Sequence, residues 1–224
     1  MNLFDLGERK IIEELKKLYG TIVDDDSYYF AEGKDYILIT TDVITKKTHI
    51  PDDVSPELAG YFFASLNFSD IAAMGGRPKY FLTSYSMRID TDFDFFMEFN
   101  RGIKKCIKKY KTKMVGGDTK EGDDFTATGI AVGKVNRNYI LLRKNFKEDQ
   151  VVAVISLNFG GDYELLFSVD RSKWQNLKEK MEKNNFKVSE IGETWKGENI
   201  LVKEGKEVKI KYHGYEHFTR STLL

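Results

Sequence analysis

The sequence predicts an α+β protein built from two structural units. Over the first 136 residues, helix-like and strand-like segments alternate as helix, two strands, helix, strand, helix and two strands, which favours a mixed sheet over a purely parallel one. A polar, charge-rich stretch from 136 to 149 separates them from a second set of strands with one helix. A hydrophobic content of 41% in 224 residues is sufficient for one large core or two small ones.

The first element is an amphipathic helix over 6–19 that ends at Gly20. Its apolar residues recur at helical spacing: Ile11, Ile12, Leu15 and Leu18. Two strands follow over 28–31 and 36–41, and the turn-like residues 32–35 between them allow a hairpin.

The next helix begins after Ser55, because a serine N-cap followed by Pro56 is typical of a helix start, and it runs until Gly75. A strand over 80–87 precedes a long helix over 93–110. The inward residues of this long helix are Phe95, Phe96, Phe99, Ile103, Cys106 and Ile107.

The remaining elements complete two units, 1–136 and 137–224. In the first unit a short strand over 113–115 stops at a Gly116-Gly117 break, and a strand over 125–132 follows. The second unit is expected to contain a strand over 151–157, a strand over 163–169, a helix over 172–183, and strands over 188–191 and 200–210.

The charge balance and the single cysteine limit which partners and which cellular compartment are expected. The 35 basic and 35 acidic residues give no net charge, so neither nucleic acid nor an anionic membrane is an expected partner. No run approaches the ~18 apolar residues that span a bilayer, and the N-terminus lacks a signal-peptide pattern. Cys106 has no partner for a disulfide and is interpreted as a core thiol rather than a nucleophile. These features predict a soluble, cytoplasmic protein.

Acidic residues stand at the ends of four predicted elements. They are Asp24-Asp25-Asp26, Asp42, Asp70 and Asp118. Element ends converge into sites, and several carboxylates in one site repel one another unless a cation lies between them. Because Mg²⁺ prefers carboxylate, hydroxyl and water oxygens, the pattern predicts Mg²⁺. The alternative is that each aspartate only caps a helix or turns the chain.

The glycine pairs differ in what they indicate. Gly75-Gly76 is typical of a helix end, whereas Gly116-Gly117 next to Asp118 and Thr119 lets backbone amides approach an anion. The chain has no P-loop, no Gly-x-Gly-x-x-Gly after a strand and no Gly-x-Ser-x-Gly. A zinc pair at His213 and His217 is disfavoured because no cysteine lies nearby.

Five motifs occur in a recognisable order. They are Thr40-Thr41-Asp42, the stretch 67–78 (Asn-Phe-Ser-Asp-Ile-Ala-Ala-Met-Gly-Gly-Arg-Pro), Val115-Gly116-Gly117-Asp118-Thr119, the stretch 161–167 (Gly-Asp-Tyr-Glu-Leu-Leu-Phe) and Gly214-Tyr215-Glu216-His217-Phe218. This set resembles the thiamine-monophosphate kinase family, which belongs with aminoimidazole ribonucleotide synthetase, selenophosphate synthetase and a hydrogenase maturation factor.

The resemblance implies ATP- and Mg²⁺-dependent phosphorylation of thiamine monophosphate to thiamine diphosphate, by a homodimer whose N-terminal halves pair. It assigns roles to matching residues only. Mg²⁺ would be held by Asp26, Thr40, Thr41, Asp42, Asp70 and Asp118, of which Asp42, Asp70 and Asp118 carry the catalysis. ATP would contact Gly117, Asp118 and Arg143, and the thiamine substrate would contact His49 and Tyr215. Phosphoryl transfer requires mainly positioning and charge neutralisation, which such residues supply.

The second half departs from the family pattern. A helical segment with a Ser-Asp-Gly-Leu motif is missing after residue 157, and Gly161 replaces a glutamate expected at the substrate. Asp162 and Glu164 are the nearest candidates to replace the lost carboxylates. Two alternatives therefore stay open: a catalytically weakened nucleotide-binding relative, and a kinase for a different small acceptor.

Overall fold

The computed structural model describes residues 2–156 and 165–210 of the chain. Contacts divide the chain into two compact units, residues 23–143 and residues 1–22 with 144–224. The predicted boundary between residues 136 and 137 lies near the observed one between residues 143 and 144. The prediction did not group residues 1–22 with the second unit.

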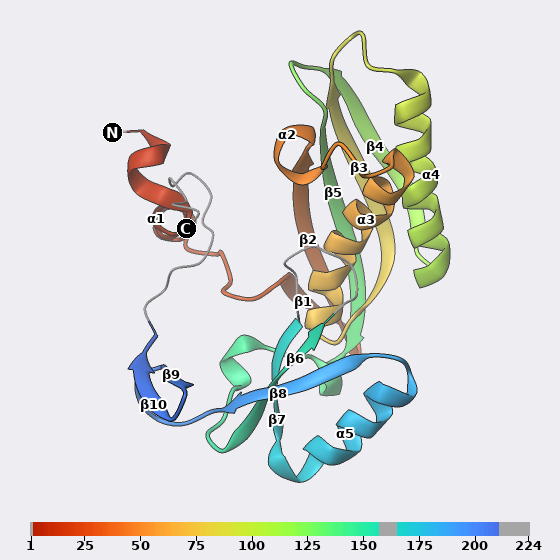
Figure 1. Cartoon of the computed structure of the whole chain (residues 1–224). Helices are drawn as coiled ribbons and strands as arrows, with labels where there is room; N and C mark the ends of the chain where they lie inside the picture. Colours follow the sequence, from red (N-terminus) through yellow and green to blue (C-terminus); the bar gives the residue numbers. More distant parts are fainter. Residues whose placement is uncertain (1, 157–164, 211–224) are drawn as a thin grey trace. The chain divides into compact units, whose positions relative to one another are not determined.

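A five-stranded sheet forms the first unit, with the order β1-β2-β5-β3-β4 (Figure 1). The pairs β1·β2, β2·β5 and β5·β3 are antiparallel, and β3·β4 is parallel. The strands are β1 (Tyr28–Glu32), β2 (Asp35–Thr45), β3 (Arg77–Met87), β4 (Lys113–Glu121) and β5 (Thr126–Asn136). The mixed sheet confirms the predicted α+β class, and β1 with β2 is the predicted hairpin.

Two long helices, α3 (Pro56–Ala73) and α4 (Phe93–Tyr110), lie on one face of this sheet, while α2 (Lys46–His49) follows β2 (Figure 1). The Ser55 hydroxyl accepts the N–H of Leu58 at 3.2 Å, so the predicted serine cap starts α3. The α4 bounds agree with the predicted helix over 93–110.

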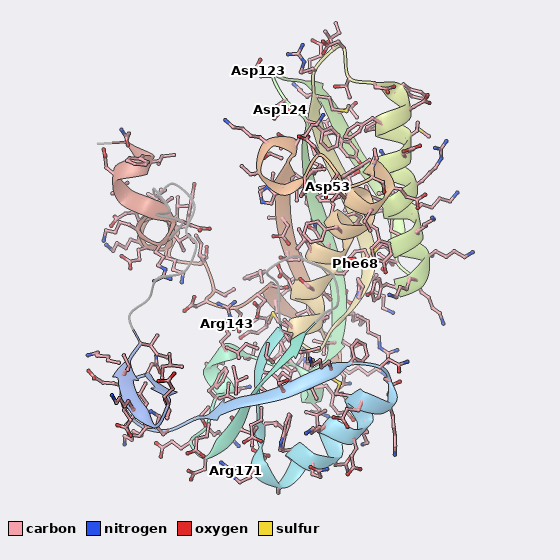
Figure 2. All side chains as sticks on the ribbon, in the orientation of Figure 1. Asp53, Phe68, Asp123, Asp124, Arg143 and Arg171 are labelled. Carbon is pink, nitrogen blue, oxygen red and sulfur yellow. The ribbon has the colours of Figure 1, made fainter. Side chains whose placement is uncertain are left out.

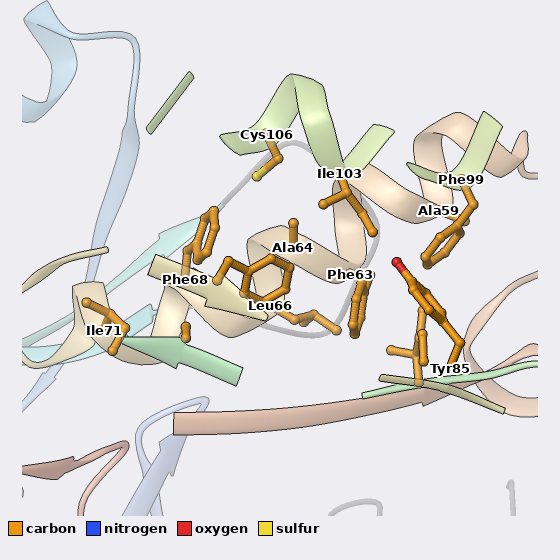
Figure 3. Close-up of a cluster of buried hydrophobic side chains, with 14 of the residues drawn as sticks. Ala59, Phe63, Ala64, Leu66, Phe68, Ile71, Tyr85, Phe99, Ile103 and Cys106 are labelled. Atoms are coloured by element: carbon orange, nitrogen blue, oxygen red, sulfur yellow. The ribbon is translucent and has the colours of Figure 1, made fainter. Parts of the chain in front are cut away.

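Aromatic side chains form the core between these helices and the sheet (Figure 3). The Phe63 ring of α3 lies 5.9 Å from Phe81 of β3 and 5.7 Å from Phe99 of α4, measured between centroids, and all three are fully buried. Each such side chain contributes about 2 kcal/mol by leaving water. Cys106 is also fully buried, which confirms the core thiol.

The opposite face of the sheet exposes apolar side chains. On β2, Leu38, Thr40 and Ile44 are buried toward the helices, so Ile39, Thr41 and Val43 point the other way. Large apolar residues on this second face, here called the open face, are at least one-third exposed: Tyr28, Phe30, Ile39, Val43, Tyr80 and Ile130. Such a patch on a sheet is typical of an interaction surface.

The second unit contains a three-stranded antiparallel sheet, a helix, a hairpin and the N-terminal helix. Its elements are α1 (Leu3–Tyr19), β6 (Gln150–Ser156), β7 (Leu165–Asp170), α5 (Arg171–Lys183), β8 (Lys187–Glu193), β9 (Ile200–Lys203) and β10 (Lys206–Lys209), and the sheet order is β7-β6-β8. Gly20 caps α1 as predicted. The predicted strand over 200–210 is wrong, because Glu204 and Gly205 with positive φ turn it into the β9·β10 hairpin.

Two further elements differ from expectation. The predicted break at Gly116-Gly117 is wrong, because β4 continues through both glycines to Glu121 and accommodates them with a bulge opposite Phe81 and Leu82. The strand expected to end before Asp42 instead continues to Thr45. Among the described helices, none combines the length and the apolar character needed to cross a membrane.

Candidate functional site

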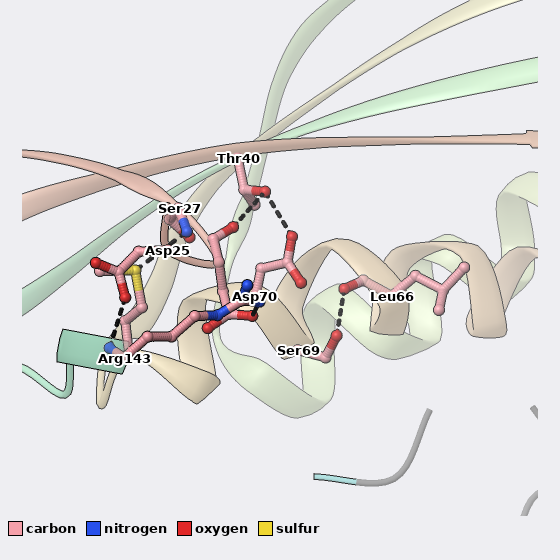
Figure 4. Close-up of polar contacts among 9 residues, drawn as sticks. Asp25, Ser27, Thr40, Leu66, Ser69, Asp70 and Arg143 are labelled. Carbon is pink, nitrogen blue, oxygen red and sulfur yellow. Dashed lines mark hydrogen bonds and ion pairs between the residues drawn. The ribbon is translucent and has the colours of Figure 1, made fainter. Parts of the chain in front are cut away.

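The C-terminal end of α3 faces β2, and the contact between them is polar (Figure 4). Thr40 lies inward on β2 and its hydroxyl donates to Asp70 Oδ2 at 2.6 Å. The same hydroxyl lies 3.3 Å from the main-chain oxygen of Asp26. Asp70 lies in the last turn of α3, so the predicted motif around it forms one side of the site.

Asp42 lies two residues after Thr40 on the same strand face. Its main-chain N–H donates to Asn67 Oδ1 at 3.2 Å, and burial raises the pKa of its carboxyl. Asp42 was predicted to follow a strand, and this is wrong because it lies inside β2. A strand interior fixes the direction of the side chain more firmly than a loop would.

The pKa of Asp70 is raised to about 6. Burial is the main cause, and the negative charges of Asp42 and Asp26 act in the same direction, while the Thr40 hydrogen bond and Arg143 oppose it. The carboxylates of Asp42 and Asp26 therefore lie close enough to Asp70 to affect it electrostatically. A cation between them would relieve this repulsion.

Arg143 supplies a cation at this site. Its guanidinium Nη2 lies 2.6 Å from Asp26 Oδ1, and its main-chain N–H donates to Asp25 Oδ1 at 2.8 Å. Hydrogen bonding to Asp26 raises the pKa of Arg143, so the group stays charged. Figure 2 shows Arg143 at the opposite end of the unit from Asp123 and Asp124, whose carboxylates therefore belong to a different region.

The donor atoms suit Mg²⁺ by their chemistry. They are carboxylate and hydroxyl oxygens, with no sulfur or imidazole among Asp26, Thr40, Asp42 and Asp70. Within the described ranges, no three Asp, Glu, His or Cys side chains are arranged to hold a metal. This arrangement fits Mg²⁺ that arrives with phosphates, because such ions usually keep only one or two protein carboxylates.

Gly117 and Asp118 lie at a separate pocket of about 350 Å³ beside β3, β4 and α4. It is lined by Thr83, Tyr85, Asn100, Met114, Gly116, Gly117, Asp118 and Thr119. The Tyr85 hydroxyl lies 2.8 Å from Asn100 Oδ1. A Cβ at Gly117 would overlap the main-chain oxygen of Thr83, so β4 can approach β3 at this point only with glycine.

Asp42 and Asp118 are far apart in one chain. Asp42 pairs with Gly129, Gly129 with Thr83, and Thr83 with Gly117. Three strand spacings of ~4.8 Å therefore separate Asp42 from Gly117, or about 14 Å along the sheet. Two oxygens on one Mg²⁺ lie only about 4 Å apart, so a single ion cannot bind both carboxylates of one chain.

The two adjacent threonines also separate. Thr40 points toward α3, whereas Thr41 is exposed on the open face and its hydroxyl donates to the Gly129 main-chain oxygen at 2.8 Å. This follows from the two-residue period of a strand. Thr41 is therefore not brought together with Asp70, and its expected role as a metal ligand stays a prediction.

His49 ends α2, close to the end of β2. Its Nδ1 accepts the main-chain N–H of Thr45 at 3.3 Å and lies 2.6 Å from Thr48 Oγ1. Because an amide N–H can only donate, Nδ1 is the acceptor in the contact with Thr45. Tyr215, Gly161, Asp162 and Glu164 lie outside the described residues.

Three residues take part in contacts that the sequence did not predict. Asp25 fixes the Arg143 backbone, Asn67 binds the Asp42 backbone, and Asn100 lines the pocket at Gly117. A signal for Asn67 was present, because an asparagine among apolar helix residues is unusual in a core unless it is hydrogen-bonded. Asp25 was part of the predicted acidic cluster 24–26, although its contact with Arg143 was not predicted, whereas Asn100 had no comparable signal.

Comparison with known proteins matches residues 23–135 to the family model described as AIR synthase related protein, N-terminal domain. The chain is 40% identical over 130 residues to a thiamine-monophosphate kinase of Pyrococcus abyssi, covering 58% of this chain and 41% of that protein. It is 30% identical over 159 residues to the thiamine-monophosphate kinase of Archaeoglobus fulgidus, covering 68% and 52%. The chain thus spans about half the length of the curated relatives it matches.

A solved structure, AaThiL complexed with AMPPCP and TMP, superimposes with a TM-score of 0.66 at 29% identity, over 70% of this chain and 50% of that one. The thiamine monophosphate kinase structure from Aquifex aeolicus gives a TM-score of 0.62 at 27% identity, over 69% and 50%. The residues matched by the family model include Asp26, Thr40, Asp42, Asp70 and Asp118.

Proposed function

The chain belongs to the family described as AIR synthase related protein, N-terminal domain, and on this premise we propose that it binds ATP with Mg²⁺ and phosphorylates thiamine monophosphate to thiamine diphosphate. The observation that carries the proposal is the group formed by Thr40, Asp70, Asp26 and Arg143. It combines hard oxygen donors with a fixed cation. The similarity to thiamine-monophosphate kinases supports the choice of substrate.

In this proposal, some residues of the chain neutralise phosphate charge and others hold those residues in position. Arg143 would bind a phosphate oxygen through its guanidinium, and the hydrogen bond from its main-chain N–H to Asp25 would hold its backbone. Asp42 and Asp70 would hold Mg²⁺, with Thr40 orienting Asp70. When bound, Mg²⁺ neutralises phosphate charge and fixes the phosphate oxygens. No covalent nucleophile is required, because the accepting phosphate is already an anion.

The pocket at Gly117 is the proposed nucleotide pocket. Its glycine pair leaves main-chain amides accessible to phosphate, and Tyr85, Met114 and Asn100 offer a mixed apolar and polar lining for a base. By the family resemblance, His49 would contact the thiamine substrate, as would Tyr215, which lies outside the described residues.

We propose that a second copy completes each site. Asp42 and Asp118 of one chain are too far apart to share an ion, and the open face presents six apolar side chains that a two-fold partner would cover. A homodimer through this face would allow Asp118 of one copy to serve the Asp42 region of the other. This arrangement supports a homodimer as the functional unit.

A second candidate is a nucleotide-binding relative without this transfer, or a kinase for another small acceptor. It is favoured by the absent Ser-Asp-Gly-Leu segment and by Gly161 in place of a glutamate. Both candidates require the same ATP site, so they differ only at the acceptor.

Calorimetry tests the shared part of the proposal. ATP should bind much more tightly with Mg²⁺ than with a chelator, because phosphate charge is otherwise uncompensated beside Asp42 and Asp70. Equal affinity under both conditions would contradict the metal assignment. Tight Mg²⁺-ATP binding without thiamine diphosphate formation would favour the second candidate.

A further inference from the structure

Asn67 is a fully buried polar residue that links α3 to the proposed metal site. Its Nδ2 donates to the Phe63 main-chain oxygen at 3.1 Å, one turn earlier in α3, and its Oδ1 accepts the Asp42 N–H at 3.2 Å. The amide is therefore held by its own helix and holds the backbone of β2. Of the residues in the proposed metal set, Asn67 hydrogen-bonds to Asp42.

Gly129 provides the space for this amide. The residue pairs with Asp42 across β2·β5, and a Cβ there would lie 2.6 Å from both Cγ and Oδ1 of Asn67. The Asn67 amide therefore occupies the space that a side chain at position 129 would fill. A methyl group at 129 must displace the amide, since the strand backbone cannot move away within a paired sheet.

Two polar contacts lock α3 over β2. Asn67 and Asp70 are one helical turn apart, and they bind Asp42 and Thr40, which are two residues apart on one strand face. Sliding the helix by one turn would shift it by ~5.4 Å and break both contacts. The spacing between the Asp42 and Asp70 carboxylates is therefore set by this pair of contacts.

We infer that Asn67 is a positioning residue for the proposed Mg²⁺-ATP site, acting by holding the Asp42 backbone and not by touching metal or nucleotide. The inference rests on the proposed function. The contrasting explanation is that Asn67 only satisfies a buried amide and so contributes to stability alone. The two explanations predict different Mg²⁺-dependent ATP affinities for a variant that regains stability but lacks the Asn67 amide.

The test compares the wild-type chain with Gly129→Ala, with Asn67→Ser, and with the double variant carrying both. The Gly129→Ala variant should lose stability and Mg²⁺-dependent ATP affinity, because the new methyl displaces the amide. The double variant should regain thermal stability relative to Gly129→Ala, since the shorter serine makes room. Its Mg²⁺-dependent ATP affinity should stay roughly 10- to 100-fold below the wild type, which is typical for loss of a residue supporting a metal ligand.

Hydrogen exchange gives a readout that needs no ligand. The Asp42 amide should exchange at least about 10-fold faster in the double variant than in the wild type, because its acceptor is gone. The matched control is Ser65→Ala, which removes another side-chain hydrogen bond of α3, to the Tyr61 main-chain oxygen, without contacting β2. This control should change neither the Asp42 exchange rate nor the affinity for Mg²⁺-ATP.

Two results would overturn the inference. One is a double variant that binds Mg²⁺-ATP as tightly as the wild type, and the other is an Asp42 amide whose exchange rate is the same in both. If the wild-type chain binds no Mg²⁺-ATP, the proposed function fails, while the exchange measurement still decides whether Asn67 holds Asp42.

Discussion

The Arg143 guanidinium lies 2.6 Å from the Asp26 carboxylate in an ion pair that joins two groups with different expected ligands. Asp26 is expected to bind Mg²⁺, and Arg143 is expected to contact ATP. The pair would have to separate only if both ligands needed the atoms in this contact, which are Oδ1 of Asp26 and Nη2 of Arg143. The separation costs little, since the Arg143 side chain is 58% exposed and such pairs contribute only ~0–1 kcal/mol.

This pair predicts different effects of Arg143→Met on binding and on folding. Loss of a charge-assisted contact to phosphate should weaken ATP binding by about 10-fold or more. The free energy of unfolding should fall by less than about 1 kcal/mol, because the pair is partly exposed. Calorimetry and urea unfolding measure the two quantities.

The control for this variant is Arg137→Met, six positions earlier, whose guanidinium lies 5.4 Å from the centre of the Tyr36 ring. This change should leave ATP affinity within about 2-fold. An Arg143→Met protein with normal ATP affinity and lower stability would assign Arg143 a structural role only.

The raised pKa of Asp70 predicts the direction of a pH effect. Between about pH 4, the usual value of an unfolded aspartate, and about pH 6, the folded chain keeps a proton on Asp70 that the unfolded chain has lost. The free energy of unfolding therefore decreases as pH rises through this window. Asp70→Asn should remove that part of the slope, since the amide does not titrate.

Urea unfolding at several pH values checks this prediction. The control Asp90→Asn removes an exposed carboxyl whose pKa is lowered by its hydrogen bond with Arg88, so it should leave the Asp70 contribution to the slope in place. If the Asp70→Asn and wild-type slopes agree between pH 4 and pH 6, burial at Asp70 does not govern its titration.

The open face predicts a dimer that charge disrupts. Val43→Lys introduces an ammonium group on this face, where the valine is 52% exposed in a single chain, and burying it against a partner is costly. Sedimentation should show a shift from dimer to monomer. Ile191→Lys is a control on β8, where the isoleucine is 60% exposed, and it should leave the dimer unchanged.

Mixed dimers test whether each site uses two copies. Asp42→Asn and Asp118→Asn should each abolish most activity alone. If Asp42 of one copy works with Asp118 of the other, a mixed dimer of the two variants has one intact site of two. It should then recover about half of the wild-type activity. No recovery in purified mixed dimers would mean that both residues act within one chain.

Local patterns could be predicted from the sequence, whereas contacts between distant segments could not. Ser55 and Gly20 have strong intrinsic preferences for helix ends, so both boundaries were predicted correctly. Strand β2 ends at Thr45, later than the predicted end before Asp42, and the β-branched Val43 and Ile44 favour this longer strand.

The candidate site was predictable in its residue types but not in its geometry. The motifs identified Asp42, Asp70 and Asp118, yet their separation depends on the order of strands in the sheet, which no local pattern encodes. The role of Asn67 depends on the absence of a side chain at Gly129, more than 60 residues later. Such complementarity is visible only when the fold is known.

The most direct test of the central claim is formation of thiamine diphosphate from thiamine monophosphate and ATP by the purified chain. The proposed function predicts product with Mg²⁺, no product with a chelator, and a strong loss in Asp42→Asn, because the carboxylate beside Asn67 is removed. Tight binding of Mg²⁺-ATP with no thiamine diphosphate at any enzyme concentration would contradict the claim that this chain is a thiamine-monophosphate kinase.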